Sequence, residues 1–322
     1  MGPGVWRMPE GLFIRDERLA SLLNEGERFL VGGLGGGCDI GNALLTAFAL
    51  TLMDKEIYLC GVHRSDVRAL RRAELVEEHG IRCLAKVGPA SYWHRPERLP
   101  EPVVAELLTL DRYGLKLPGL RGERVFVISR SQGVSQIAKA LAFLKDSLGL
   151  DGIILVDGGG DSLVFGHEPA LATAIGDAMT IAALSDIDSA IQGVVALGAD
   201  VEIPLKILLS NLRELGKKGA LLGGLRPEGR ARALFLKASS ILLSRIRSNS
   251  LNIFYLSVRG FRGTMRVRRA WLKITPLQAY TFLMDPKAVA EHSYLVKLAR
   301  EHDDFARIKR ALEDFRRLKG LA

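Results

Sequence analysis

The feature that most constrains the fold is an apolar segment that runs directly into glycines flanked by two aspartates. Gly152–Val156 is a short apolar run, typical of parallel strands that are covered on both faces, and Asp157 stands where such a strand ends. Gly158–Gly160 lack β-carbons, so the backbone can take positive φ values and a ligand can approach the amides. Asp161 ends the glycine run. The segment predicts either a tight strand-to-helix turn or a ligand or metal site.

Strand, loop and helix units alternate along much of the chain. A strand at 28–31, a glycine-rich loop at 32–41 and an apolar helix at 42–53 form the opening of a parallel α/β unit. Further strands are expected at 56–62, 81–87, 124–129, 190–197 and 252–258, and helices at 65–79, 134–148, 169–184, 204–215, 227–245 and 303–319. Residues 88–102 lack a period and are expected to form a surface excursion. We therefore predict a doubly wound α/β fold with a mainly parallel, Rossmann-like sheet.

The domain organisation is predicted from periodicity and charge. Residues 1–24 are expected to form an arm and a short helix, 25–258 the α/β core with its glycine-rich loops, and 259–322 a basic strand and helix extension packed on the core. The net charge is +9, and residues 245–322 hold 17 Lys or Arg against 7 Asp or Glu. Any polyanion-binding surface, including one for nucleic acid, is therefore expected in this last quarter.

The composition favours a cytoplasmic protein. No apolar run reaches the length of a membrane span, and the first residues lack the order of a secretory signal. Three cysteines are too few for a disulfide framework, so reduced thiols are expected. Cys38 is either a nucleophile or a small residue tolerated at a turn. Arg outnumbers Lys and Gln is scarce, which suits a thermophile. The oligomeric state stays open, a homo-oligomer included.

Four predicted loops follow the carboxyl ends of strands, where parallel α/β sheets bind their ligands. They span 32–41, 129–133, 157–166 and 198–202. The carboxylates of these loops suit a hard divalent cation such as Mg²⁺ or Mn²⁺, and their amides and hydroxyls suit a phosphate or nucleotide. A structural role is the alternative, because an aspartate can cap a helix or hold a turn.

Particular residues are assigned to each role. The expected metal ligands are Asp39, Asp157, Asp161 and Asp200, with Glu202 beside them. The expected cofactor-binding residues are Gly33, Gly35, Gly36, Gly37, Ser129, Ser131, Gly158, Gly159 and Gly160. Asp157, Asp161 and His167 are the catalytic candidates. In the structural alternative, His167 and Glu168 are only polar residues that precede a helix beginning at Pro169.

Three further residues have two interpretations each. His63 and Arg64 either meet a ligand phosphate or are solvated, and Asp177 lies either at the exposed edge of its helix or turned into the site.

Two familiar phosphate motifs are not matched. The first glycine loop lacks an exact G-x-G-x-x-G, and no acid closes the second strand, so a standard NAD site is not expected. Gly36 and Gly41 have the spacing of a P-loop, but Asn42 and Ala43 replace its Lys and Ser or Thr. The loop either cradles an anion with its backbone or serves close helix-to-strand packing.

In combination, three motifs resemble a prokaryotic, largely archaeal family catalogued as domain of unknown function 1152. They are Gly35–Asp39, the Val156–Asp161 segment with Glu168-Pro169 and Asp177-Ala178, and Leu197–Asp200 with Glu202–Pro204. The similarity spans roughly residues 28–227, with a weaker echo at Asp285-Pro286. The usual first loop has four glycines before its aspartate, whereas this chain has three and then Cys38. The resemblance implies an α/β fold and a site of glycines and aspartates, and brings no established activity.

Three functional hypotheses follow. The leading one is an enzyme that acts on a phosphorylated or nucleotide-like small molecule with a divalent cation, by phosphoryl transfer or hydrolysis. The second is a nucleic-acid-binding or nucleotide-sensing regulatory protein that uses the basic strand around Arg266 and Arg268, opposite Met265 and Val267. The third is a carrier or structural subunit that binds a ligand without turnover.

Overall fold

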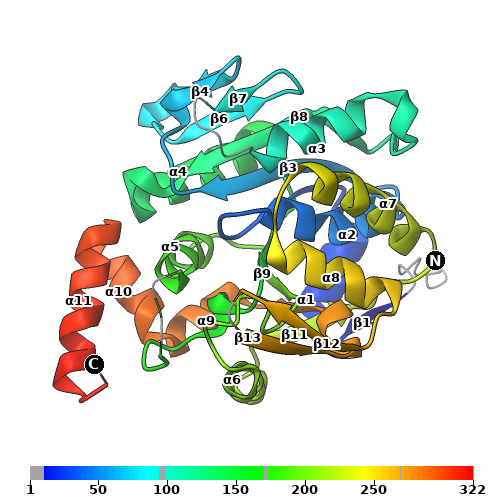
Figure 1. Ribbon diagram of the computed structural model, residues 1–322. Coiled ribbons are helices and arrows are strands. Elements are labelled where there is room, and N and C mark those ends of the chain that lie inside the picture. The colour runs from blue at the N-terminus through cyan, green and yellow to red at the C-terminus, as the bar shows by residue number, and fades with distance from the viewer. Residues whose placement is uncertain (1–10, 94–98, 170, 172, 269, 322) are drawn as a thin grey trace, which may run out of the picture.

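The computed structural model describes residues 11–93, 99–169, 171, 173–268 and 270–321 (Figure 1). The strands of the large sheet are β1 (Leu12–Ile14), β2 (Arg28–Gly33), β3 (Glu56–His63), β5 (Glu74–Val76), β6 (Leu84–Val87), β8 (Leu120–Ser129), β9 (Gly152–Gly158), β10 (Ala190–Val195), β11 (Leu221–Leu225) and β14 (Thr281–Met284). Over these described residues the order is β1-β11-β14-β10-β9-β2-β3-β8-β6-β5. The predicted α/β class with a large, mostly parallel central sheet is confirmed.

Direction within the sheet changes from centre to edge. The central strands β10, β9, β2, β3 and β8 pair in parallel. Antiparallel β14 lies between β10 and β11, and antiparallel β6 follows β8. The register places Gly158 beside Val195 and His63 beside Ser129. The carboxyl ends of the central strands therefore meet at one edge.

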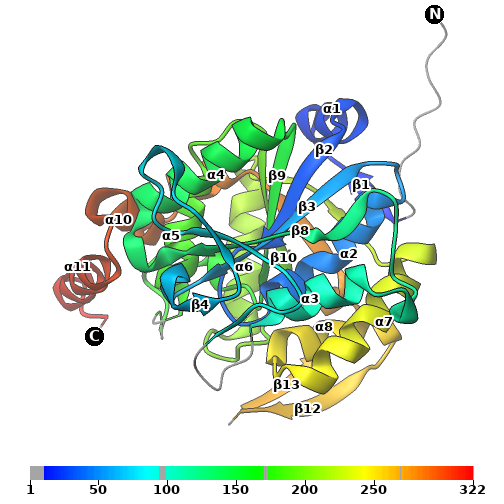
Figure 2. The ribbon, with the colours of Figure 1, turned by 90° about the horizontal axis from the view of Figure 1, so that it is seen from above.

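Helices cover both faces of the sheet (Figure 2). One face carries α1 (Glu17–Glu25), α2 (Asp39–Thr51), α3 (Pro100–Thr109), α7 (Gly229–Arg245) and α8 (Asn249–Arg259). The other carries α4 (Val134–Leu148), α5 (Ala174–Leu184), α6 (Leu205–Lys217), α9 (Pro286–His292), α10 (Tyr294–His302) and α11 (Phe305–Leu318). None of these described helices is long and apolar enough to cross a membrane.

Coverage of both faces explains why the central strands are apolar without alternation. In β2, Leu30 packs into the core on the α4–α5 face and Val31 into the core on the α2 face. In β9, Ile153 packs into the core on the α4–α5 face and Ile154 into the core on the α2 face. All four side chains are buried. Because successive side chains point to opposite faces, a strand between two helix layers needs an apolar residue at every position.

Two small antiparallel sheets stand apart from the large one. One pairs β4 (Leu70–Arg71) with β7 (Tyr92–Trp93), and the other is the hairpin of β12 (Gly263–Val267) and β13 (Ala270–Ile274). The hairpin contains the basic strand predicted around Arg266 and Arg268. Residue 269 lies outside the described residues, as do 1–10 of the predicted arm and 94–98 of the predicted excursion.

Several predicted elements are wrong. Residues 65–79 form a short 3₁₀ turn at Val67–Ala69 followed by β4 and β5, because Arg72 takes a positive φ of 54° and pairing with β6 orders the segment that follows. The strand expected at 252–258 is helix α8. The predicted excursion at 88–102 ends in α3, which begins at Pro100. Pro169 does not open a helix, since α5 begins at Ala174.

Candidate functional site

Five aspartates gather at the carboxyl edge of the central strands. Asp39 begins α2, Asp157 is the last residue but one of β9, Asp161 begins a 3₁₀ turn, Asp177 is in the first turn of α5, and Asp200 follows β10. We call these five residues the aspartate cluster. Four of them are 2–7 % exposed, and Asp200 is half-buried. Asp177 lies beside Asp39, since a β-carbon on Gly35 would be 2.3 Å from Asp177 Oδ1 and 2.9 Å from Asp39 Oδ2.

Asp39 joins the loop after β2 to the loop after β9. Its Oδ2 accepts a hydrogen bond from the amide of Gly35 (3.1 Å), and its Oδ1 accepts one from the amide of Gly158 (3.2 Å). The Asn42 amide also donates to Oδ1 (3.1 Å). A β-carbon on Gly158 would lie 1.9 Å from Asn42 Nδ2. The two glycine loops therefore form adjoining walls of one site.

Asp157 holds the glycine turn. Its Oδ2 accepts hydrogen bonds from the amide of Gly160 (3.1 Å), the amide of Ser162 (3.1 Å) and the hydroxyl of Ser162 (2.6 Å). This is the turn-stabilising role that an aspartate side chain takes at a strand end. Three bonds on one oxygen leave Oδ1 as the atom of Asp157 with capacity for a ligand.

Asp161 and Glu202 share one hydroxyl. The Oγ1 of Thr173 lies within hydrogen-bond distance of Asp161 Oδ2 and 2.7 Å from Glu202 Oε2. A threonine hydroxyl has one hydrogen to donate, so one of the two carboxyl groups must carry a proton for both contacts to be hydrogen bonds. Burial, followed by the charge of Asp157, raises the pKa of Asp161 to about 7. Asp161 is thus the natural carrier of that proton.

Asp177 and Asp200 pack against glycines of the two loops. A β-carbon on Gly35 would lie 2.3 Å from Asp177 Oδ1, and one on Gly159 would lie 1.6 Å from Asp200 Oδ2. No hydrogen bond to either carboxylate is formed within the described residues. The direction of Asp177, which the sequence leaves open, is therefore into the site.

The pKa values follow from this crowding. Burial raises the pKa of Asp39 and Asp177 well above the ordinary range, and the charge of Asp157 raises both further. Burial and the charge of Asp161 raise the pKa of Asp200 in the same way. Like charges in a buried space favour the protonated forms, so the cluster holds protons unless a cation replaces them. Carboxylate oxygens are the ligands that hard cations prefer.

The geometry is not that of an assembled metal site. Across the described ranges, no three His, Cys, Asp or Glu side chains are arranged so that they could hold one metal ion. Both oxygens of Asp39 and the Oδ2 of Asp157 already accept hydrogen bonds, as described above. Capacity for a ligand lies on Asp157 Oδ1 and on the carboxylates of Asp161, Asp177 and Asp200.

Arg130 is a site residue that the sequence analysis does not identify. Its guanidinium packs on α5, where a β-carbon on Gly176 would lie 2.2 Å from Nη1. Nε and Nη1 are buried and have no hydrogen-bond partner in the described part of the chain. Burial lowers the pKa of Arg130, against the charges of Asp177 and Asp39. The place of Arg130 between Ser129 and Ser131, in a strand-end loop, is the sequence signal that could have found it.

Most amides of the predicted phosphate cradle already donate within the protein. Gly35 and Gly158 donate to Asp39, and Gly160 donates to Asp157. Gly159 donates to the Val195 carbonyl (3.0 Å). The glycines of the second loop therefore serve the packing of the carboxylates. Gly36, in the first loop, lies close to Arg130, since a β-carbon on Gly36 would be 3.7 Å from Arg130 Nη2.

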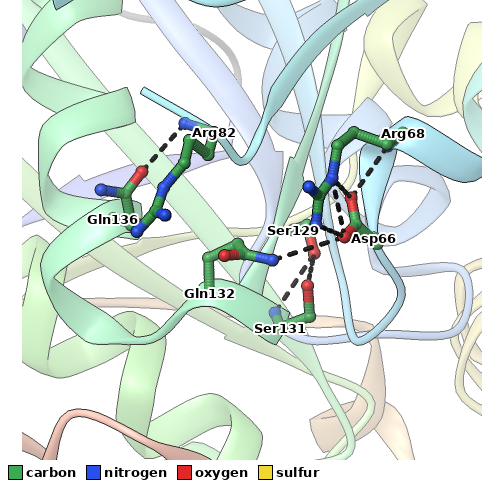
Figure 3. A network of polar contacts seen from close by, with 7 residues as sticks. All are labelled: Asp66, Arg68, Arg82, Ser129, Ser131, Gln132 and Gln136. Carbon is green, nitrogen blue, oxygen red and sulfur yellow. Dashed lines mark hydrogen bonds and ion pairs between the residues drawn. The ribbon is translucent and has the colours of Figure 1, made fainter. Parts of the chain in front are cut away.

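The loop after β8 holds its serines in a local network (Figure 3). The hydroxyls of Ser129 and Ser131 are 2.8 Å apart, and the Ser131 amide donates to Ser129 Oγ (3.2 Å). Gln132 donates to Asp66 at 3.4 Å. Ser129 is fully buried and Ser131 is exposed, so Ser131 is the serine of the pair that an external ligand can reach.

The two predicted histidines lie outside the cluster. His167 is exposed, its ring is 5.9 Å from that of Phe165, and within the described residues it forms no hydrogen bond or ion pair with the aspartates. The neighbouring Glu168 is buried and accepts from the Phe165 and Gly166 amides. His63 Nε2 lies 3.0 Å from the buried Glu101 Oε1. Neither histidine is placed to exchange a proton directly with the cluster.

The three cysteines are free and buried. Burial, followed by the charge of Glu101, raises the pKa of the Cys38 thiol. A thiol with a raised pKa is a poor nucleophile at neutral pH. Cys38 therefore fits the structural alternative, a small residue at the start of α2.

Comparison with known proteins gives one match. A family model described as "Protein of unknown function (DUF1152)" matches residues 69–318. No curated protein and no solved structure matches the chain. The matched region begins beyond the first glycine loop and includes four of the five aspartates. The chain belongs to the DUF1152 family of proteins of unknown function.

Proposed function

We propose that this protein is an enzyme that acts on the phosphate of a phosphorylated or nucleotide-like small molecule with the help of a divalent cation. The aspartate cluster is the observation that carries the proposal. Four buried carboxylates and the half-buried Asp200 repel one another on one edge of the sheet, and either protons or a bound cation would relieve that repulsion. Asp161, Asp177 and Asp200 are the carboxylates proposed for Mg²⁺ or Mn²⁺, and they would have to move together to hold one ion. The bound ion would supply charge neutralisation and an activated water.

The strand order supports the same place for a ligand. The order β8-β3-β2-β9-β10 corresponds to 3-2-1-4-5 in chain order, the order of Rossmann-like folds. In such sheets ligands bind where the order reverses, which here is between β2 and β9. Asp39 and Asp157 flank this point. A Rossmann-like site for a nucleotide or another phosphorylated molecule is therefore part of the proposal, with no claim to a standard NAD site.

Arg130 and Ser131 are the groups proposed for the phosphate. Arg130 has buried N–H groups without a hydrogen-bond partner among the described residues, and unpaired buried donors are costly unless a ligand or a conformational change satisfies them. A guanidinium next to a carboxylate-bound cation is a common arrangement for phosphate oxygens. The role of Arg130 would be to orient the phosphate, while Asp39 and Asp157 keep the two loops in place.

Backbone strain beside Asp200 also fits a functional site. Ala196 and Val201 take positive φ values of 52° and 54°. For a β-branched residue such as Val201 this conformation is a genuine outlier. Strain of this kind persists only where the surrounding structure imposes it, and it clusters at ligand-binding sites.

The test is a thermal shift experiment on the full-length protein after treatment with a chelator. Mn²⁺ or Mg²⁺ at pH 8 should raise the melting temperature, because a ligand that binds the native state stabilises it. Asp161→Asn and Asp200→Asn should reduce the shift, whereas Asp146→Asn, an exposed aspartate of α4, should not. Release of inorganic phosphate from a panel of nucleotides and sugar phosphates then tests turnover. The proposal fails if no cation raises the melting temperature. It also fails if the two cluster variants show the same shift as the wild type and the Asp146→Asn control.

A further inference from the structure

A long segment of the chain carries positive charge without a single acid. Residues 229–284 contain 11 Lys or Arg and no Asp or Glu. The segment forms α7, α8, the β12–β13 hairpin and β14 of the large sheet. The two helices and the hairpin lie next to one another on the molecule (Figures 1 and 2). Surface cations usually alternate with acids, so a one-signed stretch of this length produces a positive potential that attracts polyanions.

The hairpin has one buried and one exposed face. Val267, Leu272 and Ile274 are buried in the core on the α8 side. The other face exposes two directly opposed pairs, Arg266 with Trp271 and Thr264 with Lys273. Strand alternation therefore presents Arg266, Trp271 and Lys273 together to solvent.

Aromatic rings lie within the positive surface. The Trp271 side chain is 71 % exposed, although a tryptophan is usually largely buried. Phe261 is 41 % exposed, and a β-carbon on Gly263 would lie 3.2 Å from its ring. Phe261 thus lies just before β12, the strand that carries Arg266.

We propose that the exposed face of the β12–β13 hairpin binds single-stranded nucleic acid. Cations that follow a phosphate backbone, combined with exposed rings on which bases stack, are the features with which proteins hold single strands. An acidic protein or an anionic membrane would use the charges but has no aromatic bases to stack on Trp271. The inference does not depend on the aspartate cluster.

The hairpin is also fixed beside that cluster. Arg268 Nη1 pairs with Glu202 Oε1 at 2.8 Å, and Glu202 is the residue that shares the Thr173 hydroxyl with Asp161. Leu272 Cδ1 lies 3.5 Å from the position of a β-carbon on Gly198. The loop that carries Asp200 therefore lies against the turn end of the hairpin.

The experiment measures binding of fluorescein-labelled 20-nucleotide single-stranded DNA and RNA to the full-length protein by fluorescence anisotropy, at two salt concentrations. Trp271→Ala should weaken binding by about tenfold or more, since one stacked base contributes on that order, and Trp271→Phe should retain most of the affinity. Arg266→Ala with Lys273→Ala should weaken binding and lower the slope of log affinity against log salt by roughly 1.4, at about 0.7 for each phosphate contact.

The matched control removes two exposed cations from helix α11, on the opposite side of the molecule from the hairpin, by Arg307→Ala with Arg310→Ala (Figure 1). Binding by this variant should equal that of the wild type. Affinity that falls equally in the control and hairpin variants would overturn the proposal, as would a failure of both oligonucleotides to bind. Binding to vesicles of anionic lipid but not to oligonucleotides would also overturn it. The substituted side chains are exposed, so these variants should fold, and circular dichroism verifies it.

Discussion

Asp161 offers the sharpest test of the charge distribution in the cluster. In the unfolded chain its carboxyl has a pKa near the ordinary value of 3.8, and in the native protein burial and the charge of Asp157 raise the pKa to about 7. Between these two values the native state keeps a proton that the unfolded state has lost. The free energy of unfolding therefore falls as pH rises from about 4 to 7, and at pH 8 the native state is destabilised by the full difference.

The magnitude follows from the shift. About three pKa units correspond to roughly 4 kcal/mol between the two protonation states, at 1.36 kcal/mol for each unit. Because the neighbouring aspartates titrate together, the effect of one substitution is smaller. Asp161→Asn places a neutral group of the same shape beside Thr173 and Glu202. In the absence of cations we expect the variant to be more stable than the wild type by about 2 kcal/mol at pH 8 and nearly equal to it at pH 4.5.

The assay is urea denaturation followed by tryptophan fluorescence at pH 4.5, 6 and 8, with a chelator present. Asp151→Asn is the matched control with the opposite sign. Burial raises the pKa of Asp151, but the amides of Arg28 and Glu27 that donate to its Oδ2 (2.9 and 2.7 Å) outweigh this and lower it. Asp151→Asn should therefore destabilise the protein, and more so above pH 4 than below it. If Asp161→Asn is less stable than the wild type at pH 8, or if the difference does not grow with pH, the account of the cluster is incorrect.

Two further predictions concern the same site. Cation binding must displace the proton of Asp161, so the apparent affinity for Mn²⁺ should rise between pH 6 and pH 8. Isothermal titration calorimetry at both pH values measures this affinity, and an affinity independent of pH would exclude the coupling. Gly159→Ala should destabilise the protein by about 3 kcal/mol or more in urea denaturation, because its β-carbon would meet Asp200 in a backbone conformation with φ of 135°. Gly37→Ala, with φ of 73° and open space around it, should cost about 1–2 kcal/mol; equal losses would mean that Asp200 does not pack on Gly159.

Local patterns predicted the elements that are determined locally. Helix α4 spans the predicted residues 134–148, where its apolar spacing and the glycine at its C-cap agree. Helix α8 was predicted as a strand because residues 252–258 are rich in aromatic and β-branched side chains. The signals for a helix lay outside that window. Ser248 caps the helix by accepting from the Leu251 amide, and Gly260 ends it with a φ of 98°.

The site could be predicted only in part for a similar reason. Strand-end position alone places Asp39, Asp157, Asp161 and Asp200 on one edge, since the carboxyl ends of parallel strands meet there. Asp177 belongs to a helix, and which way a helix turns its polar residue depends on packing between distant segments. The contact of Gly176 with Arg130 sets that rotation, and it joins residues 46 positions apart in the sequence.

The glycine run after β9 has a purpose that the sequence did not suggest. The three successive glycines predict either a tight turn or room for a ligand to approach the backbone. In the structure that room is filled by the protein, because β-carbons on Gly158 and Gly159 would collide with Asn42 and Asp200. The missing β-carbons thus let carboxylates from three loops pack more closely than like charges favour. In the proposed function a bound cation would relieve this repulsion, and for this reason the cation, rather than the phosphate, is the first ligand to seek.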